Sequence, residues 1–159
     1  MSLLRQDLPD LISGHFLLSA LVAGIAGQLA FELYAWAVSP LLFGVTLEPA
    51  NLVAAISAKV SRVSLSYGPA FLVHLLIGTL GFIFVIIVAR ILTGFKYIWS
   101  GLLSGLALWF IAQGILAPFI GRSFMMGFGA YTQSSLVGHV GMCMVIGFML
   151  DKFPADKRA

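Results

Sequence analysis

Four long apolar blocks dominate this chain and constrain what it can fold into. They cover about residues 11–38, 70–92, 97–120 and 132–150 of the 159. A helix rises about 1.5 Å per residue, so about 20 apolar residues cross the hydrocarbon core of a bilayer. Each block is therefore expected to be a transmembrane helix. The sequence predicts a single all-α domain over residues 1–159, an integral membrane four-helix transmembrane bundle in contact with the lipid bilayer.

The composition agrees with that prediction. Apolar residues make up 60% of the chain and charged residues 9%, whereas a soluble domain carries roughly 25% charged residues. This excludes a cytosolic enzyme and a disordered chain. The Lys and Arg residues are dispersed at the edges of the apolar blocks, so we expect no nucleic-acid partner. Cys143 is the only cysteine and cannot form an intrachain disulfide.

The first apolar block is expected to remain in the mature protein. It is preceded by Arg5, Asp7 and Asp10. It is also much longer than the apolar region of a cleavable signal peptide, which has about 7–15 residues. We therefore interpret it as the first span and not as a targeting segment.

The basic residues predict the orientation of the bundle. Across four spans, three of them (Lys59, Arg62 and Arg122) fall on one side. The other side carries six: Arg5, Arg90, Lys96, Lys152, Lys157 and Arg158. The positive-inside rule then predicts that the N-terminus and the C-terminus are both cytoplasmic.

The only long connection, between the first two spans, contains an amphipathic pattern over about residues 49–65. Val53, Ile56, Val60 and Val63 recur at three- and four-residue spacing. Pro49 suits the first turn of a helix. The pattern predicts a short interfacial amphipathic helix, either as a cap packed over the bundle or as a surface for a partner.

The two halves of the chain resemble each other weakly. Leu17-Leu18-Ser19, followed by Leu21 and Gln28, matches Leu102-Leu103-Ser104, followed by Leu106 and Gln113 at the same offsets. A parallel repeat would relate His74 to His139 at the same depth, about an axis along the membrane normal. Chance is the alternative, because leucines match easily in membrane helices.

One stretch of the chain runs from His74 through Lys96, Trp99, Gly101-Leu102-Leu103, Gly105 and Pro118 to Gly138-His139. This stretch resembles the YagU-like family of small bacterial inner-membrane proteins. The similarity covers the second to fourth spans, while this chain lacks much of the family's larger outer loop. The resemblance implies a multi-pass protein of the bacterial inner membrane, associated with acid tolerance and without an established enzymatic activity. It places His74 and His139 at family positions and implies no chemistry for them.

Three ionisable residues inside the predicted spans are the candidate site: Glu32, His74 and His139. Such groups cost about 2.5–3.5 kcal/mol at mid-membrane on insertion scales, so each is a functional candidate. The two histidines could be cofactor-binding, as axial ligands of haem b or in a quinone site. With Glu32 they could hold a metal, or the three could handle protons. A structural polar cluster is the alternative to all of these.

No set of catalytic residues is evident in the sequence. We therefore expect a non-catalytic accessory or structural subunit of a membrane complex, partnered by other membrane subunits or by itself. One alternative is an electron-transfer subunit that binds haem b or a quinone through His74 and His139. Another is a proton-linked acid-stress protein.

Overall fold

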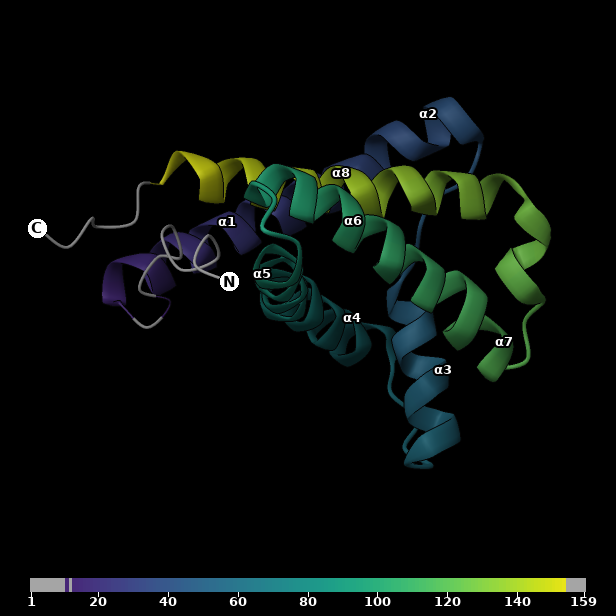
Figure 1. Cartoon of the computed structure of the whole chain (residues 1–159). Helices are drawn as coiled ribbons and strands as arrows, with labels where there is room; N and C mark the ends of the chain where they lie inside the picture. The colour runs from purple at the N-terminus through teal and green to yellow at the C-terminus, as the bar shows by residue number, and fades with distance from the viewer. Residues whose placement is uncertain (1–10, 12, 154–159) are drawn as a thin grey trace, which may run out of the picture.

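The described residues of the computed structural model, Leu11 and 13–153, form helices and connecting loops without a strand. Four helices are long and apolar enough to cross a membrane: Gly14–Phe43, Tyr67–Thr93, Tyr97–Phe119 and Ala130–Lys152. Figure 1 shows them packed into one bundle. The predicted all-α bundle and its four spans are confirmed.

Three of the four spans change their helical pitch along their length. The first is α1 (Gly14–Leu33), η1 (Tyr34–Val38) and α2 (Ser39–Phe43). The second is α4 (Tyr67–Leu76), η2 (Ile77–Gly81) and α5 (Phe82–Thr93). The third is α6 (Tyr97–Phe110), η3 (Ile111–Leu116) and α7 (Ala117–Phe119), and the fourth is the single helix α8 (Ala130–Lys152). The segments η1, η2 and η3 are π-helical, a widening that often occurs at functional sites.

The first span continues past Pro40 and beyond its predicted end near residue 38. Pro40 lies in the first turn of α2, directly after the π-helical η1, and the helix ends only at Phe43. Inside a regular α-helix a proline ring clashes with the carbonyl group four residues earlier. The π-helical widening before Pro40 relieves this clash. Gly44, with a φ of 69°, then ends the helix in the left-handed conformation.

Glycines bring α6 and α8 into close contact. A Cβ added to Gly105 of α6 would lie 2.6 Å from the Cα of Val140 and 2.9 Å from the carbonyl oxygen of His139. Gly101 faces the backbone of Cys143 in the same way. This is the small-residue packing that joins helices in membranes, where no hydrophobic effect draws them together.

The first span packs on two neighbouring spans through a face that carries two glycines. A Cβ on Gly24 would meet the side chain of Ile83 in α5, and one on Gly27 would meet the side chain of Ile146 in α8. Gly24 and Gly27 therefore serve helix packing. α1 consequently lies between the second and fourth spans.

Asp151, near the end of α8, caps the start of α6. Its two carboxylate oxygens accept hydrogen bonds from the backbone N–H groups of Tyr97 and Ile98, each at 3.0 Å. The first N–H groups of a helix have no partner inside the helix, and a negative charge there is favourable. Asp151 thus fixes the register between the third and fourth spans.

The amphipathic segment forms α3 (Ala50–Val60), which confirms a short helix but ends it before residue 65. Arg62 has a left-handed φ of 57°, which breaks the helical pattern. In Figure 1, α3 runs across the direction of α8 near α7. The Nζ of Lys59 donates to the carbonyl oxygen of Phe119 at 2.5 Å, which fastens α3 to the end of the third span. We call this end of the bundle the α3 end.

The start of α1 and the end of α8 lie together, opposite the α3 end (Figure 1). Lys59, Arg62 and Arg122 fall at the α3 end, and Arg90, Lys96 and Lys152 at the opposite end. The predicted imbalance of positive charge therefore comes from three residues outside the described part of the chain: Arg5, Lys157 and Arg158. The cytoplasmic placement of both termini stays a prediction.

Candidate functional site

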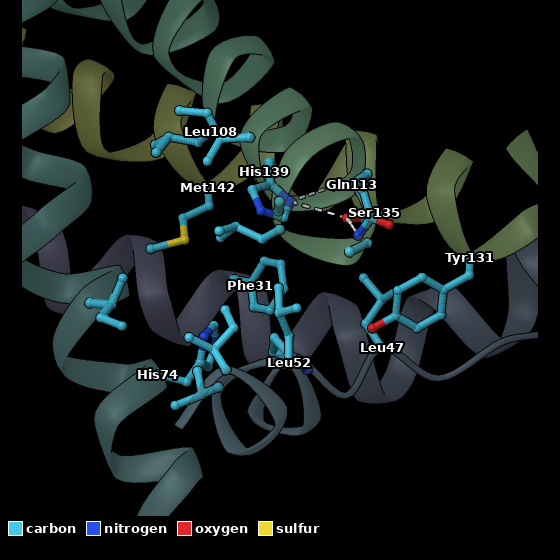
Figure 2. Close-up of a pocket in the computed structure, with 18 of the residues that line it drawn as sticks. Phe31, Leu47, Leu52, His74, Leu108, Gln113, Tyr131, Ser135, His139 and Met142 are labelled. Atoms are coloured by element: carbon cyan, nitrogen blue, oxygen red, sulfur yellow. Dashed lines mark hydrogen bonds between the residues drawn. The ribbon is translucent and has the colours of Figure 1, made fainter. Parts of the chain in front are cut away.

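A cavity of about 310 Å³ lies between α3, α4, the third span and α8. Figure 2 shows Tyr131 and Leu47 toward one end of the cavity, and Leu108 and Met142 toward the other. Along α8 the lining residues Tyr131, Ser135, His139 and Met142 share one helix face. At 1.5 Å per residue this face extends roughly 16 Å. The cavity is therefore elongated, from beneath α3 toward the middle of the bundle.

The walls are mostly apolar. Leu52, Val53 and Ile56 of α3 cover one side, while Ile111 and Leu116 belong to the third span. Polar side chains are few among the lining residues: His74, Gln113, Arg122, Tyr131, Ser135 and His139. A concave, largely apolar site with a few polar groups is typical of a small-molecule site, and its volume is near the lower end of the usual range of 300–1,000 Å³.

Glu32 and His74 are brought together at the side of this cavity. The Nε2 of His74 lies 3.3 Å from the Oε1 of Glu32. The amide nitrogen of Gln28 donates to the same carboxylate oxygen at 2.7 Å and lies 3.2 Å from the Nε2 of His74. The indole N–H of Trp36 donates to the second carboxylate oxygen at 3.3 Å. Glu32, which does not line the cavity, therefore holds His74 from behind.

The bonds of His74 define two neutral tautomers. In one, its Nε2 accepts a hydrogen bond from the Gln28 amide and its Nδ1 carries the proton. In the other, its Nε2 donates to Glu32 and its Nδ1 is bare. The Nδ1 atom makes no hydrogen bond within the described residues and is not fully buried. His74 can thus offer the cavity either a donor or an acceptor.

His139 is held by its own helix. Its Nδ1 lies 2.8 Å from the carbonyl oxygen of Ser135, and a carbonyl oxygen only accepts, so Nδ1 carries the proton. In the neutral ring Nε2 is therefore a bare acceptor. The hydroxyl oxygen of Ser135 lies 3.3 Å from the same Nδ1 and accepts a bond of 3.1 Å from the amide of Gln113.

Gln28 and Gln113 are site residues that sequence reasoning did not select. Both amides are buried. Gln28 contacts His74 directly, and Gln113 reaches His139 through Ser135. The sequence did contain a signal for them, because Gln28 and Gln113 hold equivalent positions in the weak internal repeat. Each half of the chain therefore places a buried amide beside its own histidine.

The two histidines do not face each other. The ring of Phe31 lies between them in Figure 2, with its centroid 5.7 Å from that of His74 and 6.1 Å from that of His139. The space at two glycines near the histidines is also filled. A Cβ on Gly78 would meet the amide of Gln28, and a Cβ on Gly138 would meet Phe31. This arrangement does not fit a haem held between His74 and His139.

The predicted metal set does not come together either. Glu32 and His74 are in contact, whereas His139 lies beyond Phe31 with its Nδ1 on Ser135. Within the described residues, no three side chains of the His, Cys, Asp or Glu type are grouped so that they could hold a metal ion. Glu32 therefore contacts His74 and does not contact His139.

Comparison with known proteins finds no family model, no curated protein and no solved structure that matches this chain.

Proposed function

We propose that this chain is a multi-pass membrane protein that takes one amphipathic molecule from the bilayer into the cavity between α3, α4, the third span and α8. The elongated apolar cavity, with two histidines on its wall, carries this proposal. Single-molecule occupancy follows from the volume of about 310 Å³, which leaves no room for a two-chain lipid.

Photolabelling in nanodiscs tests this function, with two probes that differ only in charge: a diazirine-bearing fatty acid and its methyl ester. We expect at least one of them to label cavity residues of α3 or η3, as mapped by peptide mass spectrometry. Ala112→Phe should abolish this labelling, because Ala112 lines the cavity and a phenyl ring would fill it. Ala107→Phe is the matched control, since Ala107 is exposed on the same span. Labelling that is absent with both probes, or unchanged by Ala112→Phe, would contradict the proposal.

A quinone is the second candidate ligand, favoured by the two histidines with ring nitrogens that the protein leaves free. His139 offers an acceptor, and His74 can offer a donor through Nδ1. A quinone carbonyl oxygen can accept a bond from the Nδ1–H of His74, and a hydroxyl of the reduced quinol can donate to the Nε2 of His139. The ring could stack on Phe31. This version keeps the predicted electron-transfer role and drops the haem.

A short-chain quinol, the reduced form with hydroxyl donors, should then compete with the photolabel in the cavity. His139→Phe should remove this competition while leaving labelling by the alkyl probe intact, because phenylalanine keeps the apolar surface and loses the ring nitrogens. Competition that persists equally in His139→Phe would count against the histidine-bound quinone.

The remaining sequence-based predictions concern the setting of the protein. A non-catalytic accessory role in a membrane complex suits a small protein that holds a ligand for a larger partner. The inner membrane of a bacterium, two cytoplasmic termini and a link to acid tolerance come from the charge distribution and the YagU-like resemblance. With that orientation, the α3 end faces away from the cytoplasm, and the cavity draws its ligand from the outer leaflet.

A further inference from the structure

Among the described residues that line the cavity, Arg122 is the one charged side chain besides the two histidines. A guanidinium group stays protonated at any physiological pH. In the described part of the chain, the one contact between a carboxylate and a basic side chain joins Glu32 and His74. Arg122 therefore has no carboxylate partner within that part. Arg122 is partly exposed, and its guanidinium at the edge of the cavity is a group that can bind an anion there.

The backbone holds Arg122 at this place. The N–H of Arg122 donates to the carbonyl oxygen of Ala117 at 3.0 Å, and the N–H of Gly121 donates to that of Pro118 at 2.9 Å. This pair of bonds is a Schellman motif, which closes the C-terminus of a helix. Gly121 has the left-handed φ of 93° that the motif requires. Arg122 is thus positioned by the end of the third span and does not sit on a free loop.

The charges around Arg122 reinforce its sign. Lys59 is bonded to the end of the same span, at the carbonyl oxygen of Phe119. The described connections at the α3 end, residues 44–66 and 120–129, carry Lys59, Arg62 and Arg122 against a single acid, Glu48. Glu48 accepts a hydrogen bond from Asn51. The α3 end therefore attracts anions in sum as well as at Arg122.

The cavity is long, and its end far from Arg122 is apolar. From Tyr131, next to the start of α8, the lining passes His139 and reaches Met142. The far end is formed by apolar side chains, among them Leu108, Phe82 and Ile77. A long apolar cavity with a cation at one end matches a molecule with an apolar chain and an anionic head.

We propose that the ligand is a single-chain anionic lipid of the fatty-acid type, with its carboxylate on Arg122 and its chain along α8 toward Met142. This inference rests on the proposed function and specifies its ligand. A charge-assisted bond between guanidinium and carboxylate is among the strongest polar contacts and can be bidentate. The acyl chain of a two-chain lipid and a neutral quinone both lack the carboxylate that Arg122 would hold.

A competing role for Arg122 needs no ligand. A cation beside the C-terminus of a helix interacts favourably with the helix dipole, here that of the third span. That role predicts a loss of stability on removing the charge, but no preference of the cavity for an acid over its ester. The choice of probes separates the two roles.

The test compares the photoreactive fatty acid with its methyl ester in wild type, Arg122→Gln and Arg62→Gln, again in nanodiscs. In wild type the acid should label the cavity residues about tenfold more efficiently than the ester. Arg122→Gln should remove the preference. Arg62→Gln should keep it, because Arg62 is exposed at the same end but does not line the cavity.

The outcomes are distinguishable. Equal labelling by acid and ester in wild type, or a preference that survives Arg122→Gln, overturns the anionic ligand while the cavity function stands. No cavity labelling by either probe overturns the cavity function itself. Displacement of the label by a short-chain quinone but not by unlabelled oleate assigns the cavity to the neutral ligand and also overturns this inference. If Arg122→Gln folds poorly, Arg122→Lys provides the second variant, and it should retain a reduced preference for the acid because it keeps the charge and loses the bidentate geometry.

Discussion

Gly105→Ala is expected to destabilise the protein by about 2–3 kcal/mol, at the upper end of the usual cost of overpacking. The new methyl group would lie 2.6 Å from the Cα of Val140 and 2.9 Å from the carbonyl oxygen of His139. Both atoms belong to the backbone of α8, so neither can rotate away as a side chain can. The two helices must separate, and the contact between the third and fourth spans is lost.

Gly141→Ala is the matched control for this prediction. Gly141 lies on α8, close to Val140, but nothing lies within 4 Å of the position of its Cβ. The same substitution there should be neutral, or stabilising by up to about 1 kcal/mol, because alanine favours a helix over glycine. Equilibrium unfolding in mixed micelles, followed by circular dichroism, measures both variants. Equal stabilities for Gly105→Ala and Gly141→Ala would show that α6 and α8 are not packed as described.

Gly105→Ala should also reduce ligand labelling in the folded fraction. His139 lies on the segment of α8 that Gly105 contacts, and it lines the cavity. A displacement of α8 therefore moves a ring nitrogen that faces the ligand. Gly141→Ala should leave labelling unchanged.

Gly78→Ala has the second largest expected effect, and it acts on the candidate site. A Cβ on Gly78 would collide with the amide oxygen of Gln28, which is buried. The amide must then leave its place and give up its bonds to Glu32 and His74. We expect a loss of about 1–3 kcal/mol, the cost of leaving a buried polar group without its partners.

A double-mutant cycle tests this cause directly. Gln28→Ala removes the amide and makes room for the new methyl group, so Gly78→Ala should cost much less in the Gln28→Ala background. The coupling between the two positions should be at least about 1 kcal/mol, in the range found for residues in contact. Additive effects would mean that Gly78 does not hold the Gln28 amide.

Two further measurements complete the test of Gly78. The ¹⁵N chemical shifts of the His74 ring report which nitrogen carries the proton, and they should change in Gly78→Ala because the Gln28 bond to Nε2 is lost. Gly81→Ala is the control in the same π-helical segment. Its Cβ would meet the side chain of Ile77 at 3.7 Å, an ordinary van der Waals contact. The His74 shifts should not change in that variant.

The candidate site was only partly accessible to sequence reasoning. Glu32, His74 and His139 are conspicuous because ionisable groups are costly inside a bilayer. Which of them meet depends on how each helix is rotated, and hydropathy does not report rotation. The structure brings Glu32 to His74 and places Phe31 between the two histidines. Phe31 carries no local signal that distinguishes it from any other apolar residue of a span.

The sequence by itself determined the architecture of this protein. Hydrophobicity and length are local properties, and in a bilayer every backbone polar group must be satisfied within the segment, so long apolar blocks become helices. The four spans and the α3 helix followed from this. The tertiary structure alone decided the cavity, because its walls come from α3 and from all four spans. It also decided the place of Arg122. In the sequence Arg122 is a basic residue of a loop like others, and it lines the cavity only because α3, the third span and α8 pack together.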